Sequence, residues 1–278
     1  MFRIAGLHLS LFLILTILTP GLAAADAAFD RWVQEFWRTA RAAGISADTY
    51  NRAFSGVTPD PEVMEKARFQ PEFVKPMAQY VFQAVSDKRL NDGRRKLSEF
   101  DHLLDAVERH YGVDRHVVVA IWGMESSYGQ VLGNPKIVRN IIRSLATLAY
   151  ADARRSRFAR KQLIASLKIL QRGDISVRDM TGSWAGAMGH TQFIPTTFEA
   201  YAVDFDGDGR RNVWSEVDAL ASTANYLKKA GWQSGKTWGY EVVLPQGFDY
   251  RLADSDRSMT LAEWSGHNIR RPDGRSFP

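Results

Sequence analysis

Glu125 is the residue of this sequence whose type and position best suit a general acid. It lies in the segment Asp114–Gly129, which opens on a helix-capping aspartate and is then almost wholly apolar. Val118, Ile121 and Trp122 precede it by seven, four and three residues. The carboxylate therefore shares the stripe that should face the core, where burial would raise its pKa towards the range that suits proton donation near neutral pH. The alternative is a glutamate at a helix end that reaches solvent or pairs with an arginine.

A glycine-rich segment, Gly182–Pro195, offers groups that could bind a sugar. Trp184 and Phe193 could stack on sugar faces, while Ser183 and Gln192 provide hydrogen-bonding groups. The segment matches neither a P-loop nor a dinucleotide fingerprint, so we expect no organic cofactor. A tight, buried loop between two helices would have a similar composition and is the alternative.

A third motif predicts a cation-binding loop. Asp204, Asp206 and Asp208 stand at positions 1, 3 and 5 of an EF-hand-like loop, and Gly209 stands at position 6. Oxygen ligands at alternate positions converge on one point when a glycine turns the chain, and such ligands suit Ca²⁺. A bare turn that binds nothing is the alternative.

The end of this loop departs from the standard pattern. Position 12 is Ser215, where the standard loop has glutamate, so Glu216 or Asp218 must complete the site. The flanking segments Pro195–Val203 and Val217–Lys229 both have the pattern of helices, as the motif requires. The residues alone leave the closing ligand open between the two acids.

Apolar spacing predicts that helices position all of these groups. Apolar residues recur at helical intervals over 29–40, 73–89 and 97–111, and strand signals are scarce before residue 235. Neither an internal repeat nor a Ser/Gly-rich or Pro-rich linker divides the chain. We therefore expect a mainly α protein with one helical domain over about 26–234, followed by a tail in which Tyr240–Leu244 can form a short strand.

The N-terminus has the order of a secretory signal peptide. Arg3 is followed by an apolar run, Ile4–Leu18, and then by Ala23–Ala25, which supplies a cleavage site. We therefore expect residues 1–25 to be removed and residues 26–278 to be soluble in the periplasm, with no integral membrane segment. An uncleaved membrane anchor is the alternative.

Composition narrows the function classes further. The absence of cysteine among 278 residues excludes a disulfide scaffold, a Cys-ligated metal, a cysteine nucleophile and a lipoprotein anchor. Removing residues 1–25 takes away Arg3 and no acid, so the net charge falls from +5 to +4. An exported cationic protein favours an acidic cell wall over nucleic acid as its partner. The histidines lack metal-ligand spacing and are expected at surface or packing positions: His102, His110, His116, His190 and His267.

As a set, these motifs resemble the lytic murein transglycosylase B family. The resemblance runs from about residue 29 to residue 275, and the combination of motifs is specific although each piece alone is not. The matching segments are Trp122–Ser126, Ser144–Tyr150, Gly186–Pro195, Val203–Gly209 and Ala224–Leu227, with Gln70–Phe73 upstream.

The resemblance implies a lysozyme-like transglycosylase domain over 26–278, with its core at about 80–234, that cleaves peptidoglycan between N-acetylmuramic acid and N-acetylglucosamine. In that family a single glutamate, matching Glu125, protonates the glycosidic oxygen and then acts as base while the muramyl 6-hydroxyl attacks C1. The product is a 1,6-anhydro sugar, and no water is consumed. None of the acids between Glu125 and the Asp204 loop lies on an apolar stripe with cleft-like neighbours, which agrees with a single catalytic carboxyl; these acids are Asp152, Asp174, Asp179 and Glu199.

The resemblance also implies the ligands of the glycan strand. Position by position, the family's saccharide contacts match Ser183, Gln192, Tyr226, Tyr80, Arg154, Arg155 and Phe158. Phe158 stands where the family often has tyrosine, so a hydroxyl contact is lost there. The two arginines would meet carboxylates of the peptide stem.

For the cation loop, the resemblance implies a span of 204–218 that is closed by Asp218 rather than Glu216. The family's loop is longer than the standard EF-hand loop, which accounts for the missing glutamate. The ligands would be the side chains of Asp204, Asp206, Asp208 and Asp218 and the backbone carbonyl of Arg210. Because the loop tethers two helices, we expect the Ca²⁺ to be structural.

The chain stops at Pro278, before the final segment with which members of this family usually continue. A non-catalytic murein-binding protein of the same fold is therefore one alternative to the transglycosylase. A muramidase that uses water on the same fold is a second.

Overall fold

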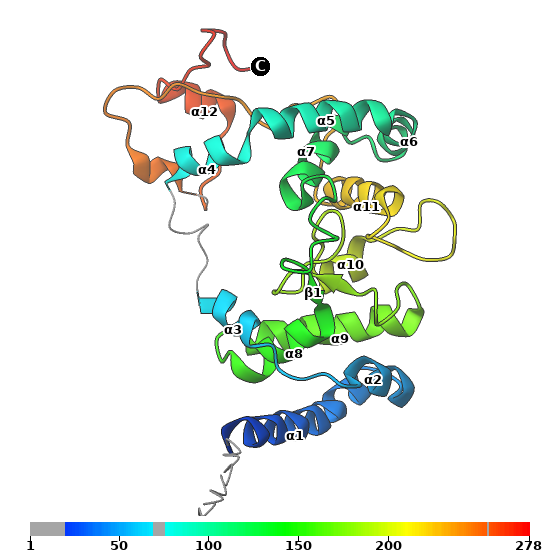
Figure 1. The fold of residues 1–278 in the computed structure, drawn as a ribbon. Helices are drawn as coiled ribbons and strands as arrows, with labels where there is room; N and C mark the ends of the chain where they lie inside the picture. The colour runs from blue at the N-terminus through cyan, green and yellow to red at the C-terminus, as the bar shows by residue number, and fades with distance from the viewer. Residues whose placement is uncertain (1–19, 69–75, 255) are drawn as a thin grey trace, which may run out of the picture. The chain divides into compact units, whose positions relative to one another are not determined.

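Helices make up most of the structure, and the named strands form one short pair (Figure 1). The computed structural model describes residues 20–68, 76–254 and 256–278. Most of the predicted signal peptide and the whole of the segment Gln70–Phe73 lie outside the described residues, so these two predictions receive no structural account. The mainly α fold class with little β structure, predicted from apolar spacing, is confirmed.

The chain divides into two compact units, Met1–Trp232 and Gln233–Pro278. In the first unit, two strands, β1 (Arg139–Asn140) and β2 (Thr181–Gly182), pair antiparallel. Its described helices are α1 (Pro20–Ala42), α2 (Ala47–Phe54), α3 (Pro61–Arg68), α4 (Met77–Ala84), α5 (Asp87–Glu99), α6 (Asp101–Tyr111), α7 (Arg115–Ser126), α8 (Ile141–Ala151), α9 (Ser156–Arg172), α10 (Pro195–Tyr201) and α11 (Glu216–Lys229).

The described part of the first unit contains two hydrophobic cores. The first core packs α1, α2, α3, α8, α9 and α10 together, and its buried side chains include Phe29, Phe36, Ile141, Leu163 and Phe198. The second core packs α6, α7 and α11 together, and its buried side chains include Leu104, Val118, Trp122 and Leu220. In Figure 1, α5, α6, α7 and α11 lie on one side of the unit and α1, α2, α8 and α9 on the other, with α10 and β1 between them.

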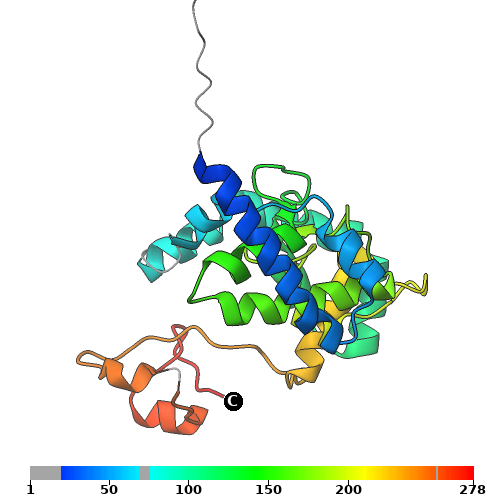
Figure 2. The same ribbon diagram turned by 90° about the horizontal axis from the view of Figure 1, so that it is seen from below.

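Aromatic contacts attach α1 to α8 and α9, which it crosses in Figure 2. Trp32 and Phe36 stack with ring centroids 5.2 Å apart, and the guanidinium of Arg160 on α9 lies 5.4 Å from the Trp32 ring. Tyr150 of α8 packs edge-on against Phe29 at 5.4 Å. These are the apolar positions from which a helix over 29–40 was predicted, and that prediction is confirmed.

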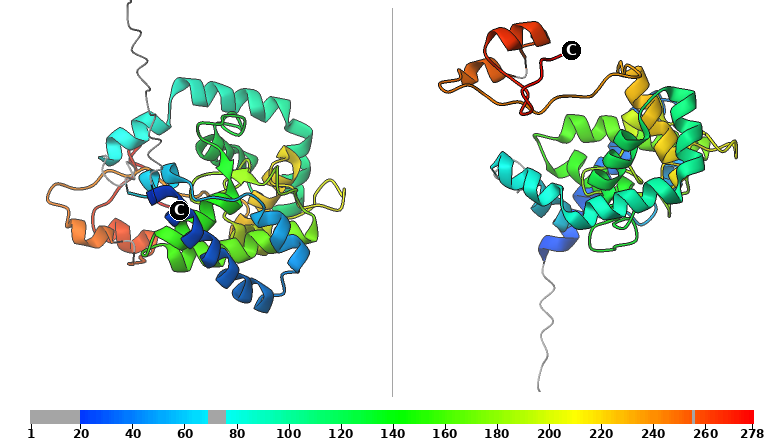
Figure 3. Two further views of the ribbon diagram at one scale, coloured as in Figure 1. Left: turned by 60° about the horizontal axis from the view of Figure 1, so that its bottom comes forward. Right: turned by 90° about the horizontal axis from the view of Figure 1, so that it is seen from above.

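Two other predicted helices are divided in the structure. The helix predicted over 73–89 breaks at Ser86, because this side chain caps α5 by accepting a hydrogen bond from the backbone N–H of Arg89. The helix predicted over 97–111 breaks at Phe100, and α6 turns away from α5 there (Figures 1 and 3). Apolar spacing alone runs across both breaks, so it predicts the elements but not their ends.

The β1–β2 pair opens the glycine-rich segment. Bridges from Met188 to Gly182 and to Phe193 fold this segment back on itself. A Cβ added at Gly182 would lie 2.0 Å from the carbonyl oxygen of Ala187, and one at Gly189 would lie 2.1 Å from a backbone oxygen of the loop before α11. Both positions therefore require glycine, because backbone approaches backbone too closely for any side chain.

The second unit has few regular elements. It contains a short 3₁₀-helix, Tyr250–Ala253, and α12 (Leu261–Gly266), which begins with a capping box. Of the predicted strand Tyr240–Leu244, the structure has a single antiparallel bridge, from Val243 to Arg270. An apolar pocket of about 390 Å³ in this unit is lined by side chains that include Tyr240, Phe248, Tyr250, Trp264 and Phe277. Among the described helices of the whole chain, none is both long enough and apolar enough to span a bilayer.

Candidate active site and metal loop

Glu125 lies in the last turn of α7. The helix begins as predicted, because the carboxylate of Asp114 accepts a hydrogen bond of 2.7 Å from the backbone N–H of His116. The prediction that Glu125 faces the core is wrong: the buried stripe of α7 runs through Val118 and Trp122 to Ser126, and Glu125 lies exposed beside it. Surrounding protein atoms still remove part of the water around the carboxyl, and this desolvation raises the pKa of Glu125 above its ordinary value.

The carboxyl of Glu125 has no hydrogen bond or ion pair within the part of the chain that the structure describes. The predicted alternative of an arginine partner therefore does not hold, although the side chain does reach solvent. A solvent-accessible carboxyl with a raised pKa and no partner is free to give a proton to a bound molecule.

The turn after Glu125 is tightly constrained. Ser127 and Tyr128 both have positive φ angles, 51° and 59°, which side chains rarely adopt. The Tyr128 ring fits against Gly93 of α5 and Gly123 of α7, where an added Cβ would lie 2.6 Å and 2.5 Å from its atoms. The Tyr128 hydroxyl donates a hydrogen bond of 2.9 Å to the carbonyl oxygen of Arg89. Packing of this kind pays for local strain and holds the end of α7 in one place.

His190 connects α7 to the glycine-rich loop. Its Nδ1 accepts a hydrogen bond of 2.9 Å from the indole N–H of Trp122, and its Nε2 donates one of 3.1 Å to the carbonyl oxygen of Trp214. Its carbonyl oxygen accepts a hydrogen bond of 2.6 Å from the hydroxyl of Ser126. These bonds fit the neutral ring with the proton on Nε2, and burial lowers the pKa of His190. The histidine is a packing residue, as predicted, but its linking role left no sign in the sequence.

Three of the predicted saccharide ligands lie on the glycine-rich loop, Ser183 and Gln192, and on α11, Tyr226. The Ser183 hydroxyl oxygen accepts hydrogen bonds from the backbone N–H groups of residues 185 and 187, at 3.3 and 3.0 Å. Gln192, with φ 54°, donates from its amide to the carbonyl oxygen of Gly189 at 2.8 Å. Tyr226 is 39% exposed and packs edge-on against Phe193, with ring centroids 6.2 Å apart. Each of the three keeps part of its side chain accessible for a ligand.

The predicted arginine pair lies at the turn between α8 and α9. The Asp152 carboxylate accepts hydrogen bonds from the backbone N–H groups of Arg154 and Arg155, and it pairs with the Arg155 guanidinium at 2.8 Å. That guanidinium also lies 5.8 Å from the Trp184 ring, which connects the turn to the glycine-rich loop. Phe158, one turn further on, is 42% exposed.

Tyr80 lies apart from this group. It is 40% exposed on α4, and within the described chain no side-chain hydrogen bond, ion pair or ring contact joins it to the other predicted ligands. Ser183 and Gln192 thus lie on the glycine-rich loop, Tyr226 and Arg155 contact aromatic residues of that loop, and no such contact is found for Tyr80 among the described residues.

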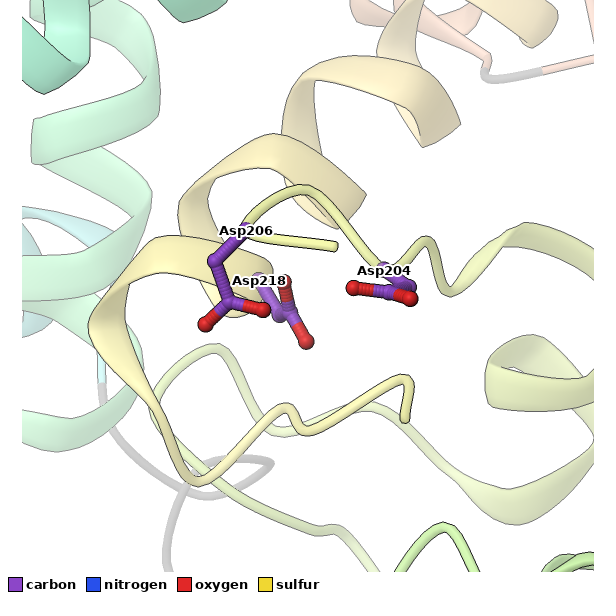
Figure 4. Close-up of side chains that lie close together, drawn as sticks. All are labelled: Asp204, Asp206 and Asp218. Carbon is purple, nitrogen blue, oxygen red and sulfur yellow. The ribbon is translucent and has the colours of Figure 1, made fainter. Parts of the chain in front are cut away.

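Three aspartates of the predicted cation loop meet in space. Asp204 and Asp206 of the loop and Asp218 of α11 each place a carboxylate oxygen within 4.8 Å of the other two (Figure 4). Oxygen atoms around a Ca²⁺ ion at 2.3–2.6 Å have separations of about this size. Asp208 lies outside the cluster, and its carboxylate accepts from the backbone N–H of Arg210 at 2.8 Å.

Asp218 is the buried member of the cluster, with 1% of its surface exposed. Its two carboxylate oxygens accept backbone N–H groups of Phe205 and Asn212, each at 2.7 Å, and burial raises the pKa of Asp218. Three converging carboxylates repel one another, so a divalent cation fits the donor set. Glu216, the other candidate for closing the loop, faces His190 instead, at 3.9 Å from Nε2.

The sequence matches the transglycosylase SLT domain family over residues 28–278. The chain belongs to this family. Membrane-bound lytic murein transglycosylase B of Escherichia coli (strain K12) is 36% identical over 163 residues, which are 57% of this chain and 44% of that protein. SltB3 of Pseudomonas aeruginosa, solved in complex with NAG-anhNAM-pentapeptide, is 52% identical with a TM-score of 0.82, over 90% of this chain and 66% of that one.

A third similar structure is that of the Escherichia coli lytic transglycosylase Slt35, solved in complex with calcium. It is 24% identical with a TM-score of 0.70, over 91% of this chain and 78% of that one, and shows the fold alone. The predicted lysozyme-like transglycosylase fold is confirmed by these likenesses. The chain spans 44% of the E. coli lytic transglycosylase B and 66% of SltB3.

Proposed function

We propose that this protein is a peptidoglycan lytic transglycosylase that cleaves the MurNAc-β-1,4-GlcNAc bond without water and forms 1,6-anhydromuramyl products. The observation that carries the proposal is Glu125, a carboxyl with a raised pKa, open to solvent and unpartnered within the described chain, on a helix hydrogen-bonded to the glycine-rich loop. Family membership and the complexes of SltB3 with NAG-anhNAM-pentapeptide and NAG-NAM-pentapeptide support it.

The four acids between Glu125 and the cation loop are all engaged by other side chains. A hydrolase of the two-carboxylate type needs a second carboxylate at the scissile bond, to activate water or to attack the sugar. The pairs are Asp152 with Arg155, Asp174 with Arg211, Glu199 with Arg172 and Asp179 with Ser176. A mechanism with one protein carboxyl and help from the substrate's own acetamido group fits this arrangement better than water-dependent hydrolysis.

The proposed reaction uses Glu125 twice. Its carboxyl first gives a proton to the glycosidic oxygen, and the bond from that oxygen to C1 of the muramyl residue breaks while the acetamido oxygen stabilises C1. The resulting Glu125 carboxylate then takes the proton of the muramyl 6-hydroxyl as that oxygen bonds to C1. The acid is restored, and neither water nor an oxidant is consumed.

In this proposal the remaining predicted residues bind and orient the strand. Ser183, Gln192 and Tyr226 contact the sugars, with Tyr80 and Phe158 at the periphery. Arg154 and Arg155 face carboxylates of the peptide stem, because a guanidinium binds a carboxylate strongly.

A structural Ca²⁺ at the cluster of Asp204, Asp206 and Asp218 belongs to the same proposal. When bound, the ion would neutralise three carboxylates and tie the loop to α11. Asp208 and the backbone carbonyl of Arg210 remain proposed ligands whose supporting argument is the resemblance. Slt35, a protein of this fold, was solved with calcium.

We also place the mature chain, 26–278, in the periplasm as the transglycosylase domain, with residues 1–25 as its signal peptide. The support is the order of charge, apolar run and small residues at the N-terminus, together with the net charge of +4 on the mature chain, which suits an acidic cell wall. Murein is then the partner, and nucleic acid is not.

Digestion of purified sacculi, followed by mass spectrometry of the released muropeptides, tests the function. Anhydro ends, lighter by one water than reducing ends, are the expected result. Reducing ends would instead indicate a muramidase, and the absence of release would indicate a murein-binding protein without activity.

A further inference from the structure

A second, polar pocket lies beside the end of α7. Its volume is about 160 Å³, and its lining combines the first turns of α5 with the turn that follows Glu125: Ser86, Lys88, Arg89, Asp92, Ser127, Tyr128 and Gln130. The guanidinium of Arg89 lies 3.7 Å from the sulfur of Met124, the residue before Glu125. The pocket therefore adjoins the proposed acid on the α5 side, whereas Arg154 and Arg155 lie at the α8–α9 turn (Figure 1).

The charges of the pocket leave one cation without an acid. The Asp92 carboxylate pairs with Lys88 at 2.6 Å through one oxygen and with Arg95 at 2.8 Å through the other. Arg89 donates to the carbonyl oxygen of Ala84 and approaches Met124, and no carboxylate contacts it within the described chain. A guanidinium has five N–H donors, so most of those on Arg89 remain available.

Uncharged donors complete the lining. The hydroxyl of Ser127 has no hydrogen-bond partner among the described residues, and the Gln130 amide reaches Asp92 only at 3.5 Å. The hydrogen bond from the Tyr128 hydroxyl to the Arg89 carbonyl oxygen holds the two walls of the pocket together. The guanidinium of Arg89, the ammonium of Lys88, which shares Asp92 with Arg95, a free hydroxyl and an amide form a donor set that suits a carboxylate.

We propose that the pocket of Lys88, Arg89 and Ser127 binds a carboxylate of the peptide stem on the muramyl residue. The inference rests on the proposed function, because it takes its ligand from that substrate. The sugar rings of the strand are uncharged, so an anion-binding pocket beside the acid has the stem as its only anionic neighbour along the strand. The pocket thereby makes a second contact with the stem, distinct from that of the arginine pair.

Calorimetric binding of GlcNAc-MurNAc-peptide tests this directly, with the same compound carrying amidated carboxylates as the comparison. Neither contains the MurNAc-GlcNAc bond, so neither is cleaved under the proposed activity. The wild-type protein should bind the acid about tenfold more tightly than the amide, the effect of a hydrogen bond to a charged group. Replacing both cations, Lys88→Gln with Arg89→Gln, should reduce this preference by weakening binding of the acid alone, and the preference that remains belongs to the arginine pair.

The matched control is Arg94→Gln, which removes an exposed cation of the same helix whose one hydrogen bond to a described side chain is to Asn91; it should keep the preference. Equal wild-type affinities for acid and amide, no measurable binding of either, or a parallel loss of both in the double variant would each overturn the subsite. Unchanged binding of the amide by the double variant shows that the variant is folded, so that a loss of acid binding is assigned to the pocket. Failure of the proposed function is seen separately, as sacculi that yield no anhydro ends while the acid preference persists.

Discussion

The indole N–H of Trp122 donates a hydrogen bond of 2.9 Å to Nδ1 of His190, and the two residues belong to different halves of the first unit. Trp122 lies in the second core, with Glu125 one turn further along its helix, while the loop on either side of His190 packs into the first core. Ser126 adds a second bond to the same residue, at 2.6 Å. Hydrogen bonds to the buried His190 thus fix the helix of the proposed acid relative to the loop of the proposed sugar ligands.

Replacing His190 should loosen this connection. In His190→Leu the Trp122 indole and the Trp214 carbonyl lose their partner inside the protein, and each buried unsatisfied group costs about 1–3 kcal/mol. Urea unfolding should therefore show a clear loss of stability, and His102→Ala, at an exposed position, should show none. Unchanged stability in His190→Leu would mean that water or rearrangement satisfies these groups.

His190 should also make stability depend on pH. Burial, opposed by Glu216 and by the hydrogen bond to Trp214 and reinforced by Lys96, lowers its pKa in the folded state below the ordinary value of 6.5. The unfolded chain then binds more protons than the folded chain as pH falls below about 6.5, so stability decreases there until the folded-state pKa is passed. His190→Gln should flatten this part of the stability–pH curve, and an unchanged slope would assign the effect to other groups.

Glu125→Gln should abolish anhydro-muropeptide release while leaving the fold intact. General acid–base catalysis contributes about 10²–10⁴-fold, so the loss should be at least of this order. Because desolvation raises the pKa of Glu125, the acid form that starts the reaction should persist above the ordinary range of a glutamate, and activity should fall as pH rises through the raised pKa. Release at the wild-type rate by Glu125→Gln would refute the catalytic assignment.

Calcium should raise the melting temperature of the wild-type protein, and a chelator should lower it again. A ligand present at ~100 times its Kd stabilises the folded state by about 2.7 kcal/mol. Asp206→Asn removes one carboxylate of the cluster and should reduce the calcium response, whereas Glu65→Gln, an exposed acid elsewhere, should preserve it. Identical melting curves with and without chelator would argue for an empty loop. A reduced effect of calcium on the melting temperature of Asp208→Asn would show that Asp208 is also a ligand.

Gly123→Ala should disturb the turn after the acid. The added methyl group would lie 2.5 Å from the Tyr128 ring, which is itself packed against Trp122 with centroids 5.7 Å apart. Overpacking of this kind costs about 1–3 kcal/mol, and a shift of the α7 end should lower activity as well. Gly133→Ala, where an added Cβ meets nothing within 4 Å, is the control. Equal behaviour of the two variants in thermal unfolding would show that the turn can adapt.

Much of this arrangement could be predicted from single residues and their spacing. Asp114 indicates the start of α7, and Asp204 and Asp206 indicate a turn whose carboxylates converge. Both features depend on residues that are close together in the sequence. The exposure of Glu125 could not be predicted, since a helical stripe has an edge and only packing decides which residues occupy it. The pocket of Lys88 and Arg89 joins segments some 40 residues apart, and nothing local in either segment marks it.

The glycine-rich loop also limits how this site can diversify. At Gly182 and Gly189 a neighbouring carbonyl oxygen lies about 2 Å from where a Cβ would be. Every side chain other than hydrogen would therefore clash with the backbone there, whatever its chemistry. Directed evolution of sugar preference should therefore spare these two positions and vary Ser183, Trp184 and Gln192, whose side chains are partly accessible. The side chains proposed to contact the sugars can be varied, while the backbone turns beneath them cannot.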